Sequence, residues 1–203
     1  MSTPAVSQSR PVFDAHARLN LNPAHWGVQA VAEIGVAIAL AAVLGQMRIF
    51  VMPQGGSVSL EMVPIIFVAV RRGVVPAATA GMLYGLLQLG LPGAFVFHPV
   101  QAALDYPLAF MALAMAGFVD VRGWRTLALA VALATLARFA CHFLSGAIFF
   151  AAYAPAWEAW WLYAATYNLL YLVPEGVLTT LLLWPLLKAY DAAFPGRGRR
   201  TAS

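Results

Sequence analysis

Charged residues are scarce in this chain. Lys, Arg, Asp and Glu make up 10% of its 203 residues, whereas hydrophobic residues make up 62%, and the mean hydropathy is +0.78. Soluble globular domains carry about 25% charged residues, so the composition excludes that class and indicates a polytopic membrane protein. The formal net charge of +4 does not indicate a nucleic-acid partner, because the basic residues are spread between apolar segments.

Cysteine and the common catalytic motifs are also nearly absent. The single cysteine, Cys141, excludes a disulfide framework and argues against a cysteine-based metal site. The sequence has no HExxH, no GxSxG around Ser145 and no phosphate-binding GxxxxGK[ST]. We therefore predict no catalytic residues, no metal and no cofactor, and expect any ATP hydrolysis to occur in separate subunits.

Long apolar runs dominate what is present. About 20 apolar residues span the hydrocarbon core, and six segments qualify as spans: 29–50, 57–70, 74–92, 99–119, 126–152 and 161–188. We predict an all-α bundle of six transmembrane helices over 26–190, a cytosolic tail over 1–25 without a signal peptide, and a basic cytosolic tail over 191–203. The loop 53–56 is expected to dip into the membrane, where protein or water satisfies its backbone.

The basic residues predict the orientation of the bundle. Ten of the twelve Lys and Arg fall on one side of the six-span arrangement: Arg10, Arg18, Arg71, Arg72, Arg122, Arg125, Lys188, Arg197, Arg199 and Arg200. Arg48 alone falls in an opposite connection, and Arg138 lies inside the fifth segment. The positive-inside rule therefore predicts cytosolic termini in a multi-pass plasma-membrane protein.

Polar residues within the apolar segments are the candidate site. Asp105 lies in the fourth segment, and helical spacing places Arg138, His142 and Ser145 on one face of the fifth. Asn168, Tyr171 and Glu175 share a face of the sixth in the same way. One interpretation is structural: Arg138 pairs with Glu175 or Asp105 and joins the helices, while Glu61 is paired or interfacial.

Aromatic residues accompany three of these polar groups. Tyr106 adjoins Asp105, Phe149 and Phe150 follow His142, and Tyr163 precedes Asn168. A pocket of rings, one carboxylate, one imidazole and one amide suits a small, flat, positively charged ligand. Two other hypotheses remain open: an intramembrane enzyme using His142, Asp105 and Glu175, and a solitary carrier that relays protons.

Small residues recur in the first segment, where Ala37 and Ala41, and Gly35 and Ala39, are four residues apart. This spacing lets two helices approach closely in lipid. The stripe is interpreted either as a contact with another subunit or as packing within the chain.

Three stretches resemble a known family: RRGVVPAATAGMLYGLLQLGLPGAFVFHPVQAALDYPLAF, LARFACHFLSGAIFFAAYAP and YNLL. The family is the thiamine-specific, substrate-binding S component of energy-coupling factor (ECF) vitamin transporters. The resemblance implies a six-helix bundle that binds thiamine near the outer face. It also implies docking on a transmembrane coupling subunit driven by two cytosolic ATPase subunits, with a thiamine precursor or analogue as the alternative cargo.

The same resemblance implies individual roles. It assigns ligand binding to Asp105, Tyr106, His142, Phe150, Tyr163, Asn168, Gln88 and Tyr84, and docking on the coupling subunit to Ala37 and Ala41. The chain departs from the family pattern at three of these positions. Phe150 replaces a tryptophan, Gln88 a histidine and Asp105 a glutamate, and the loop at Gly55 lacks a tryptophan that caps the site.

Overall fold

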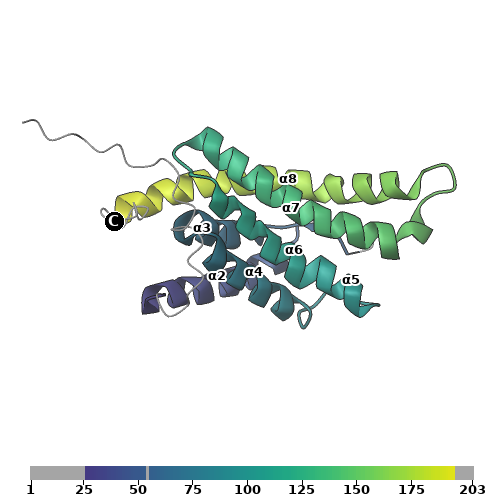
Figure 1. The fold of residues 1–203 in the computed structure, drawn as a ribbon, viewed down its shortest axis with the longest axis horizontal. Helices are drawn as coiled ribbons and strands as arrows, with labels where there is room; N and C mark the ends of the chain where they lie inside the picture. The colour runs from purple at the N-terminus through teal and green to yellow at the C-terminus, as the bar shows by residue number, and fades with distance from the viewer. Residues whose placement is uncertain (1–25, 54, 195–203) are drawn as a thin grey trace, which may run out of the picture.

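The computed structural model describes residues 26–53 and 55–194. Most of them are helical (Figure 1). The elements are α2 (Val28–Gln46), β1 (Phe50–Val51), β2 (Ser57–Val58), α3 (Met62–Arg72), α4 (Val74–Gln88), α5 (Pro99–Ala103), η2 (Leu104–Leu108), α6 (Ala109–Ala112), η3 (Leu113–Phe118), α7 (Trp124–Phe149), η4 (Ala151–Tyr153) and α8 (Trp160–Ala193).

The six predicted helical segments are present in the predicted order, with α5 to η3 forming one continuous segment. Four are long and apolar enough to cross a membrane: α2, the 99–118 segment, α7 and α8. The other two are shorter, since α4 has 15 residues and α3 has 11. The predicted tail 1–25 lies outside the described residues, as does 195–203, and α8 continues to Ala193 where the sequence placed the start of the C-terminal tail.

Helices α7 and α8 form a long antiparallel pair along one side of the molecule (Figure 1). The connection between them lies at one end, together with the start of α5. The start of α2 and the end of α8 lie at the opposite end. An even number of helical segments brings the two ends of the described chain to the same side.

A short hairpin replaces the predicted helical residues on either side of Pro53. Helix α2 ends at Gln46, and Phe50 and Val51 then pair antiparallel with Val58 and Ser57. The prediction that helix spans 29–50 and resumes at 57 was therefore wrong at these ends. Pairing of the two strands satisfies their backbone groups without helix formation.

The 99–118 segment changes its helical pitch at Asp105. Residues Leu104–Leu108 form a π-helical turn that contains Pro107, and residues Leu113–Phe118 continue as a 3₁₀ helix. Proline has no N–H and cannot complete a regular α-helical ladder. Single π turns occur frequently at functional sites, and this one carries the candidate carboxylate.

Of the small residues of α2, Ala37 and Ala41 pack inside the chain, whereas Gly35 and Ala39 are exposed. Ala37 is 4% exposed and Ala41 is fully buried, and both belong to the main core cluster with residues of α3 and α4. Their methyl groups are therefore already covered by the same chain. This agrees with packing within the chain, one of the two interpretations of the stripe. The lipid-accessible side of α2 presents larger side chains, including Val36, Leu40 and Val43.

Candidate functional site

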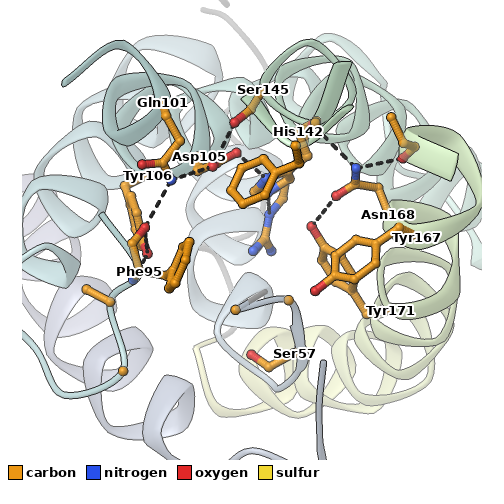
Figure 2. Close-up of a pocket in the computed structure, with 18 of the residues that line it drawn as sticks. Ser57, Phe95, Gln101, Asp105, Tyr106, His142, Ser145, Tyr167, Asn168 and Tyr171 are labelled. Atoms are coloured by element: carbon orange, nitrogen blue, oxygen red, sulfur yellow. Dashed lines mark hydrogen bonds and ion pairs between the residues drawn. The ribbon is translucent and has the colours of Figure 1, made fainter. Parts of the chain in front are cut away.

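A pocket lies near the end of the bundle that holds the α7–α8 connection, since Phe150 and Tyr163 beside that connection line it. Figure 2 shows this pocket in close-up. Its walls come from the β1–β2 hairpin, the end of α4, the loop after α4, the π turn, α7 and α8. Seven of the eight sequence-predicted binding residues line it: Gln88, Asp105, Tyr106, His142, Phe150, Tyr163 and Asn168. The eighth, Tyr84, is fully buried and is not among the lining residues.

Three donors hold the Asp105 carboxylate. Gln101 Nε2 and Ser145 Oγ donate to Oδ2 at 2.7 and 2.8 Å, and His142 Nδ1 lies 3.1 Å from Oδ1 (Figure 2). A carboxylate has about four acceptor positions, so one remains for a ligand donor. The Asp105 side chain is 17% exposed, which leaves it accessible from the pocket.

His142 connects this carboxylate to a deeper arginine. Arg138 Nε donates to His142 Nε2 at 3.2 Å. Arginine has no acceptor, so Nε2 carries the lone pair and the proton of a neutral ring lies on Nδ1. That proton points to Asp105 Oδ1, and the imidazole is held neutral and in one orientation beside the carboxylate.

Arg138 also joins two buried glutamates. Its Nη2 lies 2.9 Å from Glu61 Oε1 and its Nη1 lies 3.2 Å from Glu175 Oε2. The predicted pairing of Arg138 with Glu175 is confirmed, whereas Asp105 pairs with His142. Buried charges persist when each is paired and hydrogen-bonded, and Ser59 Oγ adds a bond to Glu175 Oε1 at 3.0 Å.

Tyr84 and Gln88 belong to this deeper network. The Tyr84 hydroxyl donates to Glu61 Oε2 at 2.6 Å, and Gln88 Nε2 donates to the same oxygen at 2.8 Å. Tyr84 therefore supports the pocket floor from below. Gln88 reaches the pocket itself, and its buried Oε1 has no hydrogen-bond partner among the described residues.

Aromatic rings form the α8 wall. Tyr163 and Tyr167 have ring centroids 5.9 Å apart, and Tyr167 and Tyr171 have centroids 6.2 Å apart. The Tyr171 hydroxyl donates to Asn168 Oδ1 at 2.7 Å, and Asn168 Nδ2 donates to the main-chain oxygens of Ala164 and His142 at 2.8 and 3.3 Å. Asn168 therefore fixes α8 against α7 beside the pocket (Figure 2).

A second group of rings lies opposite. The Phe150 centroid is 6.1 Å from that of Phe95 and 5.4 Å from that of Phe97. The Tyr106 hydroxyl accepts from Phe95 N at 2.6 Å, which fixes the loop after α4 to the π turn. Rings of both groups therefore line the same pocket as the Asp105 carboxylate.

Several lining residues were not among the predicted binders, notably Arg48, Glu61, Gln101 and Tyr167. Gln101 had a local signal, because it lies four residues before Asp105 on the same helix face. Arg48 also had a signal in the sequence, because it is a basic residue in a connection that the positive-inside rule assigns to the outer side. Glu61 had none, since its partner Arg138 is 77 residues away in sequence.

The charges favour a cationic ligand. Asp105 supplies a carboxylate at the pocket, and the positive charge of Arg138 is paired with Glu61 and Glu175. Aromatic faces attract cations, and a site sheltered from water strengthens the attraction. Among the described residues no group of three or more His, Cys, Asp and Glu side chains is arranged to hold a metal ion.

Comparison with known proteins identifies the chain. The family model described as thiamine transporter protein matches residues 31–195. Thiamine transporter ThiT of Bacillus subtilis is 38% identical over 144 residues, covering 65% of this chain and 75% of that protein. ThiT of Lacticaseibacillus paracasei is 36% identical over 142 residues, covering 59% and 71%.

The fold matches as well. A solved structure of ThiT from Listeria monocytogenes superposes with a TM-score of 0.72 at 26% identity, covering 81% of this chain and 96% of that one. The relatives are named as transporters, which agrees with a multi-pass membrane transport protein and not with an intramembrane enzyme. The chain belongs to the thiamine transporter protein family.

Proposed function

We propose that this chain is the substrate-binding S component of an ECF-type importer in the plasma membrane and that it binds thiamine in the pocket around Asp105. Thiamine joins an aminopyrimidine to a cationic thiazolium ring. The free acceptor position on Asp105 suits the amino group, and the aromatic walls suit the two flat rings. The carboxylate held by three donors is the observation that carries the proposal.

Preorganisation supports this assignment. Gln101, Ser145 and His142 already orient the Asp105 oxygens, so a ligand does not need to order them. Little free energy is then lost to ordering these side chains when the ligand binds, which increases the affinity. The neutral His142 ring adds a flat surface beside the carboxylate without repelling a cation.

The pocket is proposed to open toward the outside of the cell. It lies at the end of the bundle with the α7–α8 connection, away from the α3–α4 and η3–α7 connections, at or beside which Arg71, Arg72, Arg122 and Arg125 lie. Those basic connections are assigned to the cytosol by the positive-inside rule. A separate coupling subunit and two ATPase subunits would then supply the energy for release, since the sequence carries no phosphate-binding loop.

A titration tests the proposal. Thiamine is added to the detergent-purified, ligand-stripped chain while tryptophan fluorescence is recorded, with the separate pyrimidine and thiazole halves as competitors. Saturable quenching by thiamine at submicromolar concentration supports the assignment. A fluorescence change with one half of the molecule and none with thiamine contradicts the assignment and favours a transporter of a thiamine precursor. If no compound changes the fluorescence, the pocket is not the ligand site.

A further inference from the structure

The position of Arg48 is not explained by the positive-inside rule. Ten of the twelve Lys and Arg fall on the predicted cytosolic side, and Arg138 is neutralised inside the bundle by Glu61 and Glu175. Arg48 follows α2 in the connection on the other side, and it lines the pocket. A basic residue placed against the usual distribution calls for a local reason.

Only uncharged groups bind the Arg48 guanidinium in the described chain. Its Nη2 donates to the main-chain oxygen of Pro92 at 3.0 Å and its Nε to that of Gly45 at 3.4 Å. Among residues 26–53 and 55–194, no carboxylate forms an ion pair with it. Within that part of the chain, two of the five N–H groups are therefore used, and no carboxylate neutralises the positive charge.

The backbone makes room for this side chain. Gly93 has a φ of +89°, in the left-handed region, and a Cβ at this position would collide with both terminal nitrogens of Arg48. The guanidinium therefore lies directly against the Gly93 backbone. The pocket is also lined by Gly93, Ala94 and Phe95. The loop after α4, which contacts the Arg48 side chain, is therefore part of the pocket wall.

We propose that Arg48 forms an anion subsite of the pocket, which takes a phosphate carried by the ligand. The inference rests on the proposed function and extends it from thiamine to thiamine phosphate esters. Such an ester is dipolar, because it joins a cationic ring to a phosphate of charge near −2. The pocket holds a group of each charge, because Asp105 on the π turn and Arg48 on the loop that follows α2 both line it. A guanidinium binds phosphate through parallel N–H bonds.

A structural role for Arg48 gives a different expectation. If its bonds to Gly45 and Pro92 only hold the loop in place, its replacement weakens every ligand equally. An anion subsite instead changes the ratio between the affinities for thiamine monophosphate and thiamine. The ratio cancels effects of the substitution on folding or on loop position, because both ligands experience them.

The test measures both dissociation constants in lipid-free detergent for the wild-type chain, Arg48→Gln and Arg48→Lys. Lysine keeps the charge and loses the planar fork, whereas glutamine removes the charge. We expect Arg48→Gln to shift the affinity ratio about tenfold against the monophosphate, and Arg48→Lys to retain most of the wild-type ratio. Arg122→Gln, in an exposed pair with Asp120 away from the pocket, is the matched control and keeps the ratio.

The outcomes separate this inference from the proposed function. Wild-type chain that binds thiamine but not its monophosphate, or an Arg48→Gln variant with an unchanged ratio, overturns the anion subsite alone. Wild-type chain that binds neither compound overturns the proposed function. Raising the salt concentration should weaken monophosphate binding to the wild type more than to Arg48→Gln, because the lost interaction is electrostatic.

Discussion

The Arg138 Nε–H group donates to His142 Nε2 at 3.2 Å, and this contact determines which nitrogen of the imidazole faces Asp105. The arginine is 5% exposed and does not need to contact the ligand in order to affect its binding. It orients the ring that, in turn, orients the carboxylate. Arg138 is therefore a positioning residue in the proposed site.

Replacement of Arg138 should separate positioning from stability. In Arg138→Lys, the ammonium still neutralises Glu61 and Glu175 but lacks the rigid Nε–H that faces His142. We expect thiamine affinity to fall about tenfold, with a small change in melting temperature. In Arg138→Met, the two glutamates lose their partner, and the free energy of unfolding should fall by about 3–5 kcal/mol.

Thermal unfolding and thiamine titration of both variants check this prediction. Equal losses of stability in Arg138→Lys and Arg138→Met, with wild-type thiamine affinity retained in the lysine variant, would show that the arginine only pairs the glutamates.

Replacing Phe150 by an aromatic residue with a stronger cation-π interaction should raise the affinity for thiamine. Tryptophan binds a cation more strongly than phenylalanine, and the ring of Phe150 lies at the pocket wall. We expect Phe150→Trp to tighten thiamine binding about two- to fivefold, and Phe150→Leu to weaken it by a similar factor.

The uncharged pyrimidine half of thiamine is the ligand control for these variants. Its affinity should change less than that of thiamine, because it carries no thiazolium charge. Equal changes for both compounds would mean that Phe150 contributes by shape and contact area.

Gly56 should be intolerant of a side chain. A Cβ at this position would lie 2.7 and 2.8 Å from two ring carbons of Tyr171, so the hairpin would have to move away from the pocket wall. We expect Gly56→Ala to weaken thiamine binding several-fold, chiefly through faster dissociation, which stopped-flow fluorescence can measure.

Gly35→Ala is the matched control for the hairpin substitution. A Cβ at Gly35 meets no atom within 4 Å, and alanine favours the helical conformation of α2. Unchanged dissociation in Gly56→Ala would show that the hairpin does not retain the ligand.

The sequence predicts the membrane helices well, because bilayer thickness and apolar length determine them. It does not predict the hairpin at Phe50 and Ser57, since apolar residues continue across the end of α2 and conceal where the helix stops. Nor does it predict the π turn at Leu104–Leu108, although Pro107 indicates that the helix is irregular.

The candidate site was predictable where its residues share a helix face. Helical spacing relates Arg138 to His142, and Asn168 to Tyr171. Contacts between distant segments were not predictable in this way. The bond of Tyr84 to Glu61 depends on how α4 packs beside the start of α3, so Tyr84 lies below the pocket and not in its lining.

The most direct test of the proposed site is the thiamine affinity of Asp105→Asn, measured by calorimetry on the ligand-stripped chain. The substitution keeps the size of the side chain and removes its charge, and Asp120→Asn, in the surface pair with Arg122, is the control. Loss of a charge-assisted hydrogen bond predicts about 10- to 100-fold weaker binding in Asp105→Asn and wild-type binding in Asp120→Asn. Wild-type affinity in Asp105→Asn would contradict the assignment of this pocket to thiamine.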